Sequence, residues 1–149
     1  MKNTHFLIAK EEKDIRKAFL GAFIGQIDGS KAMSIKDFQE QIANAMEFPD
    51  EPARNLEELD AMLNDLQWIK EQKVIIYINH SSDWLSKEKS EEKILSVIDI
   101  LDATAEDWKW MDDEEEEGLV KKELQIVFQD SPRIKNLLEE QEIPFGIFD

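Results

Sequence analysis

The chain has 149 residues, a length that fits one domain with a hydrophobic core of its own. Its net charge of −16 repels nucleic-acid phosphates and anionic lipid, and it attracts basic proteins over long range. The absence of cysteine excludes a disulfide framework and thiolate zinc sites and fits a reducing compartment. Because no apolar run approaches membrane-spanning length and none at the N-terminus is long enough for a signal peptide, we expect a soluble cytoplasmic protein.

Apolar periodicity and turn residues predict an α/β chain. Helices separate the expected strands, so parallel pairing is expected. The expected elements, in chain order, are a strand at 6–9, a polar helical turn at 11–16, a strand at 22–27, a helix from Ser34 to about 46, a helix from Asn55 to about 66, a strand covered on both faces at 73–78, a helix at 91–103, a strand at 124–128 and a short helix from Ser131.

The most informative segment runs from Phe48 to Trp68. From Glu47, just before this segment, to Asp65 there are seven carboxylates against one cation, Arg54. Asn55 is a good N-cap, and leucines at three- and four-residue spacing predict one buried stripe on the helix that follows. A folded surface that shows carboxylates outward indicates binding of a positively charged partner.

Several short motifs occur here in an unbroken order. They are Ile27-Asp28-Gly29, the helix start at 34–38, Phe48-Pro49, the leucine repeat at 55–63, the stretch ending at Trp68 and the apolar strand at 74–78. In this order and spacing the chain resembles the barstar family of intracellular ribonuclease inhibitors, and the resemblance covers roughly 100 of the 149 residues.

The resemblance implies a small three-stranded parallel sheet packed by helices. It also implies a single domain over 1–149, with a core at about 22–130 and with residues 1–21 and 131–149 as extensions. Its function would be that of an immunity-type inhibitor, which is not an enzyme and needs no cofactor. A helix and the loop before it would occlude the active site of a ribonuclease or other nuclease toxin, with carboxylates in place of RNA phosphates.

By position, the family's binding surface falls on nine residues of this chain. They are Asp50, Glu51, Asn55, Glu57, Asp60, Ala61, Asn64, Asp65 and Trp68. The chain departs from the family pattern where Ala61 replaces the central aspartate and Asp60 replaces the neighbouring tryptophan. Glu51 and Pro52 replace two tyrosines. These departures favour a basic partner other than barnase, and Asp60 is a candidate to restore the charge missing at Ala61.

Other functions compete with nuclease inhibition. The acidic face is also compatible with an ordinary solvated surface, or with an interaction module that inhibits nothing. A metal site is disfavoured because no calcium-loop motif occurs and neither His5 nor His80 has ligand spacing to another histidine. Nucleophilic catalysis and nucleotide binding also lack their motifs.

The remaining acidic and aromatic features are open. Trp68 either flanks the binding surface or caps the core, Trp108 and Trp110 are expected to pack, and Trp84 is ambiguous. The acidic run 112–117 is expected to be solvated, with a longer reach toward a basic partner as the alternative.

Overall fold

The structure of the protein is a computed structural model that describes residues 5–49, 55–110 and 122–148. Its elements are β1 (Phe6–Ala9), α1 (Glu12–Ala18), β2 (Phe23–Asp28), the 3₁₀ turn η1 (Gly29–Lys31), α2 (Ile35–Ala45), α3 (Leu56–Leu63), β3 (Lys73–Asn79), α4 (Glu91–Trp110), β4 (Glu123–Gln129), α5 (Pro132–Glu140) and β5 (Phe145–Phe148). The α/β class agrees with the sequence-based prediction, and so does the order of elements, except that η1 and β5 were not predicted.

The sheet has five strands in the order β2-β3-β4-β1-β5, and every neighbouring pair is parallel. The expectation of three strands was therefore wrong. The residues treated as extensions supply β1 and β5, and β1 lies inside the sheet, where Phe6 is opposite both Ile126 and Phe145. Parallel pairing between segments so far apart leaves no local pattern in the sequence that would predict it. The strands β1 and β5 also have only four residues each, which makes the pattern of each strand weak.

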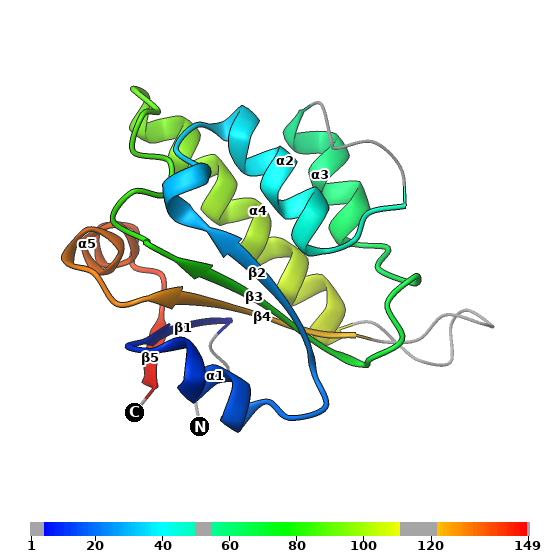
Figure 1. The fold of residues 1–149 in the computed structure, drawn as a ribbon. Coiled ribbons are helices and arrows are strands. Elements are labelled where there is room, and N and C mark those ends of the chain that lie inside the picture. Colours follow the sequence, from blue (N-terminus) through cyan, green and yellow to red (C-terminus); the bar gives the residue numbers. More distant parts are fainter. Residues whose placement is uncertain (1–4, 50–54, 111–121, 149) are drawn as a thin grey trace.

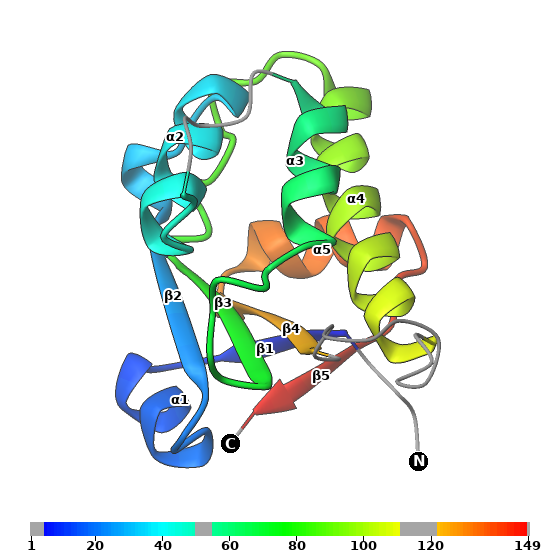
Figure 2. The same cartoon turned by 90° about the vertical axis from the view of Figure 1, so that its right-hand side faces the viewer.

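Helices cover both faces of the sheet (Figures 1 and 2), as expected for parallel strands. On one face, α2, α3, α4 and α5 enclose the larger core, which includes Val74, Ile76 and Ile78 of β3. On the other face, α1 packs through Ile15 against Ile75 and Tyr77. The prediction that the 73–78 strand is covered on both faces is confirmed.

Three helices start where their capping residues predicted. Side-chain oxygens of Ser34, Asn55 and Ser131 accept hydrogen bonds from the backbone N–H groups three residues on, at 3.1, 2.8 and 3.3 Å. In contrast, α4 continues to Trp110, well past the expected end at residue 103. The reason is that Ala105 and Trp108 prolong its buried face.

Among the described residues, no helix combines the length and apolar character needed to cross a membrane.

Candidate interaction site on α3

The helix α3 separates apolar from acidic side chains. Leu59 and Leu63 are fully buried beneath it. Its exposed residues Glu57, Glu58 and Ala61, together with Asp65 just beyond its end, form what we term the outer face of α3. Glu57 and Glu58 lie in the first turn, where the helix dipole favours negative charge. Local sequence thus accounts for both the start of this helix and its acidic outer side.

Asp60 is half-buried and is turned toward α4 rather than toward the outer face. Its Oδ1 accepts hydrogen bonds from Asn64 Nδ2 at 3.0 Å and from Thr104 Oγ1 at 3.2 Å. The Asn64 amide also donates to the Asp60 carbonyl at 2.8 Å. Since Thr104 is a fully buried residue of α4, the half-buried Asp60 links α3 to α4, and Asn64 supports the Asp60 carboxylate from the end of α3.

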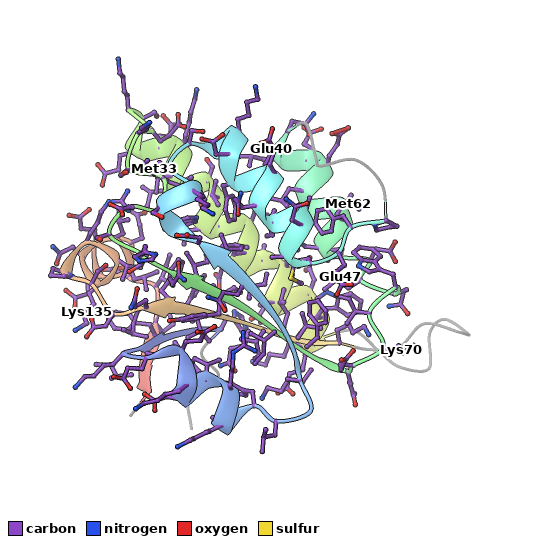
Figure 3. All side chains as sticks on the ribbon, viewed as in Figure 1. Met33, Glu40, Glu47, Met62, Lys70 and Lys135 are labelled. Atoms are coloured by element: carbon purple, nitrogen blue, oxygen red, sulfur yellow. The ribbon has the colours of Figure 1, made fainter. Side chains whose placement is uncertain are left out.

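Trp68 is half-buried and connects the chain after α3 to the end of α2. Its indole Nε1 donates to the Met46 carbonyl at 2.9 Å. Its ring meets Phe48 edge-on, with 5.7 Å between ring centroids. In Figure 3, the labelled residues Glu47, after α2, and Lys70, after Trp68, lie toward the same end of the molecule. Trp68 is therefore bonded to the backbone of Met46 and is still partly exposed, three residues after the exposed Asp65.

Two more side chains that the sequence did not single out for this role hold the same region. Trp108 of α4 donates its Nε1 to the Leu63 carbonyl at 2.8 Å, at the end of α3. The buried Lys122 donates to the carbonyls of Ile69 and Glu71 in the segment before β3, and burial lowers its pKa. The expectation that Trp108 packs is confirmed, but nothing in the sequence pattern identified Thr104 or Lys122.

The other predicted residues are placed as follows. Asn55 is exposed and caps α3. Asp50, Glu51, the acidic run 112–117 and the side chain of Trp110 lie outside the described residues. Trp84 is fully buried between Phe38 and Phe128, so it belongs to the core.

A second polar cluster lies away from α3, where β2 and β3 end. His80 Nδ1 is 3.0 Å from Asp28 Oδ1, and Ser30 Oγ donates to that oxygen at 2.6 Å. The Ser30 hydroxyl is the main reason that the pKa of Asp28 is lowered, and His80 lowers it further. In the described part of the chain, no group of three or more His, Cys, Asp or Glu residues could hold a metal ion.

Solved structures with a similar fold include two of the Aeropyrum pernix ORC2 protein. Its ADPNP-ADP complexes give a TM-score of 0.57 at 10% identity over 99% of this chain, and its ADP form gives 0.57 at 11% identity over 97%. This chain spans 41% and 42% of those chains, about two fifths of their length. At this identity the likeness concerns the fold alone.

No curated protein sequence matches this chain significantly. The model of the family described as "Barstar (barnase inhibitor)" matches residues 22–122, about two thirds of the chain. The matched region contains β2, β3 and the whole outer face of α3. The chain belongs to the barstar family.

Proposed function

We propose that this protein binds and occludes the basic active site of a ribonuclease or other nuclease toxin, as an immunity protein does, through the outer face of α3. The observation that carries the proposal is the exposure of Glu57 and Glu58 on α3 and of Asp65 just beyond its end, all within the matched family region. Neutralising a toxin that acts inside the cell places this function in the cytoplasm.

In the proposed mechanism, carboxylates take the place of RNA phosphates. Glu57 and Asp65 pair with the Arg and Lys side chains that hold phosphate in the partner. Asp60 adds negative potential from its half-buried position. Asn55, Asn64 and Trp68 shape the edges of the contact, and Asp50 and Glu51 extend it on the side of the preceding loop.

A second candidate is an interaction module that keeps the fold without inhibiting any nuclease. The observation that favours it is Ala61, which is exposed in the middle of the outer face where the family resemblance places the central aspartate. A charge pair at an interface centre can dominate affinity, a point for which barnase and barstar are themselves the standard example. Ala61 removes one partner of that pair, so we expect the partner to be a basic protein other than barnase.

We do not carry nucleotide binding over from the ORC2 structures to this chain. A helix N-terminus after a parallel strand can bind phosphate through its free N–H groups and its dipole. Here α1 begins with Glu11, Glu12 and Asp14, whose charges oppose a phosphate. We therefore do not propose a nucleotide-dependent activity, and inhibition remains the function that the family description supports.

The test is inhibition of RNA cleavage by purified nucleases. The panel contains barnase, a set of basic nuclease toxins and any basic toxin encoded beside this gene. We expect at least one enzyme to be inhibited, with association that slows as salt rises, because the field of a −16 protein is screened within about 8 Å at physiological ionic strength. Glu57→Gln with Asp65→Asn should weaken inhibition by about tenfold or more.

The matched control removes two charges elsewhere. Glu139→Gln with Glu142→Gln makes the same change at the end of α5, which lies at the other end of the helical layer from α3 (Figure 1). Equal loss with both pairs would mean that only net charge matters, against a specific surface. If no nuclease is inhibited while a non-nuclease protein binds the outer face of α3, the interaction-module alternative holds.

A further inference from the structure

Trp68 links the segment that follows α3 to the segment that precedes it. The atoms that it joins, its own Nε1 and the Met46 carbonyl oxygen, belong to residues on opposite sides of α3 in the sequence. Met46 is fully buried at the C-terminal end of α2, so one end of the tie is fixed in the core. Phe48 packs on the Trp68 ring next to this hydrogen bond. We call the contact of Trp68 with Met46 and Phe48 the indole clasp.

The helix that carries the acidic side chains depends on such ties. With eight residues, α3 is too short to be stable alone, so tertiary contacts must hold it. On its α4 side, Thr104 bonds Asp60 and Trp108 bonds the Leu63 carbonyl. Figure 2 shows α3 against α4, with α2 on the other flank. The indole clasp joins the chain just after α3 to the end of α2, so α3 lies between a tie to α4 and a tie of its following segment to α2.

Left-handed backbone turns lie near both ends of the clasp. Glu47, directly after Met46, has φ +54°, and Leu66, two residues before Trp68, has φ +52°. At the end of α2 the left-handed turn closes the helix, because the Phe48 N–H donates to the Ala43 carbonyl at 2.9 Å and the Glu47 N–H to the Asn44 carbonyl at 3.3 Å. The clasp connects the two segments in which these turns lie, since Met46 directly precedes Glu47 and Trp68 follows Leu66 by two residues.

We propose that Trp68 is a positioning residue: the indole clasp fixes the outer face of α3 in one place before any partner arrives. The role in recognition rests on the proposed function, but the clasp itself is a property of the free protein. A surface that is already ordered loses less conformational entropy on binding. Trp68 thus acts through the placement of Glu57 and Asp65, in addition to any contact of its own.

The experiment is Trp68→Phe, which keeps an aromatic ring near Phe48 and removes the indole donor. Hydrogen exchange of the free protein is measured residue by residue by NMR. We expect amides of α3, such as Leu59 and Asn64, to exchange roughly threefold to tenfold faster, since one hydrogen bond is lost. Amides of β3 and α4 should keep their rates. The Glu47 amide, next to the Met46 carbonyl, should shift in the spectrum.

The matched control is Trp84→Phe. Its buried Nε1 has no hydrogen-bond partner among the described residues, so this variant makes the same chemical change without breaking such a bond. In this variant, the amides of α3 should not gain more in exchange rate than the amides of the rest of the protein. A second variant, Phe48→Leu, keeps the indole hydrogen bond and should loosen α3 less than Trp68→Phe.

Two results would overturn the clasp: unchanged exchange in α3, or a uniform increase in all elements, which is the sign of an ordinary core residue. Neither result depends on a partner. Failure of the nuclease assay would remove the proposed function and leave the exchange result standing. Conversely, a nuclease inhibited through Glu57 and Asp65 with no change of α3 exchange in Trp68→Phe would remove only the clasp.

Discussion

Positions 60 and 61 show that the effect of a charged residue on a helix depends on the direction in which its side chain points. Asp60 and Ala61 are adjacent in the sequence, but adjacent side chains on a helix point about 100° apart. Asp60 is directed toward Thr104 of α4, while Ala61 is exposed between Glu57 and Asp65. Asp60 therefore does not stand on the outer face where a carboxylate at 61 would stand.

Ala61→Asp should strengthen binding to a basic nuclease. The new carboxylate would lie between Glu57 and Asp65, at the centre of the outer face, and a central charge pair contributes more than one at the rim. We expect a gain of about tenfold in affinity, measured as the inhibition constant. The cost is like-charge repulsion along the helix of roughly 0.2–0.5 kcal/mol per pair.

Ala61→Asn is the control, since it adds similar volume and polarity without charge. If Asn and Asp have the same effect, size rather than charge governs position 61. Weaker binding with Asp would show that the partner presents no cation there, which contradicts the phosphate-mimic mechanism.

We expect Asp28 to make the free energy of unfolding depend on pH in the acidic range. Hydrogen bonds from Ser30, and the nearby His80, lower its pKa in the folded protein. The unfolded chain, with a pKa of about 3.9, then binds the proton more readily, so this stabilisation is present above about pH 4 and is lost as the pH falls through the lower folded pKa. Asp28→Asn should cost up to about 1 kcal/mol at neutral pH and progressively less below pH 4. Urea unfolding at a series of pH values measures this difference.

Ser30→Ala provides the internal check. It leaves the carboxylate of Asp28 in place and removes the hydroxyl that most lowers its pKa. The acid-dependent part of the stability should shrink in this variant as well. Stability curves that stay parallel to the wild type from pH 5 down to pH 2 in both variants would contradict the assignment.

At the scale of the element, the N-terminus of α3 is capped by a residue of its own segment, whereas its C-terminus is capped by a residue far away in the sequence. Asn55 caps its N-terminus within the segment itself. At its C-terminus, the Leu63 carbonyl is bonded by Trp108 of α4, 45 residues later in the chain. Carbonyls at a helix end need a partner from elsewhere, and here the tertiary structure supplies it.

Asn55→Ala should destabilise α3 by about 1 kcal/mol, because the Glu58 N–H loses its acceptor. Asn55→Asp should keep the cap and add a charge that the helix dipole favours. Hydrogen exchange of α3 amides distinguishes the two: about fivefold faster in the Ala variant and close to wild type in the Asp variant. Equal rates in both variants would show that the cap is not what limits opening of α3.

At the scale of the whole molecule, β1 makes the N-terminal residues part of the core. Phe6 is fully buried, Ile8 is 1% exposed, and β1 pairs with β4 on one side and β5 on the other. His5 adds a polar link to α4, with Nδ1 at 2.8 Å from Asp102 and Nε2 at 3.0 Å from Glu106. We therefore propose that the chain folds as one unit rather than as a core with separable extensions.

A fragment of residues 22–130 should fail to fold cooperatively. It lacks Phe6 and Ile8, and loss of one such side chain alone costs about 2–5 kcal/mol. Total stabilities of native proteins are about 5–15 kcal/mol. Thermal unfolding followed by near- and far-UV circular dichroism compares the fragment with the full chain.

The control for the fragment is Leu20→Ala. Leu20 belongs to the same N-terminal segment but is 86% exposed, so its effect should stay within about 0.5 kcal/mol. A fragment that melts cooperatively near the temperature of the full chain would show that β1 and β5 are dispensable additions.

The parts of the fold that the sequence predicted were those specified by neighbouring residues. Capping by Ser34, Asn55 and Ser131 set helix starts, and the apolar run at 73–78 set a buried strand. Of the candidate site, local spacing predicted the buried leucines of α3 and carboxylates on its surface, but it did not single out the exposed Glu58. It did not predict that Asp60 is held by Thr104 or that Trp68 bonds Met46, because each of these hydrogen bonds joins residues distant in the chain.

By itself, then, the sequence determined the α/β class, the barstar family and an acidic helix with a buried leucine stripe at α3, since each follows from patterns of charge and hydrophobicity over short stretches. Only the tertiary structure decided that the sheet has five strands, that α3 is tied to α4 and that the segment after α3 is tied to the end of α2. The physical reason is the same in both cases. Strand pairing and side-chain hydrogen bonds between distant segments depend on which surfaces meet when the chain closes on itself, and no local pattern contains that information.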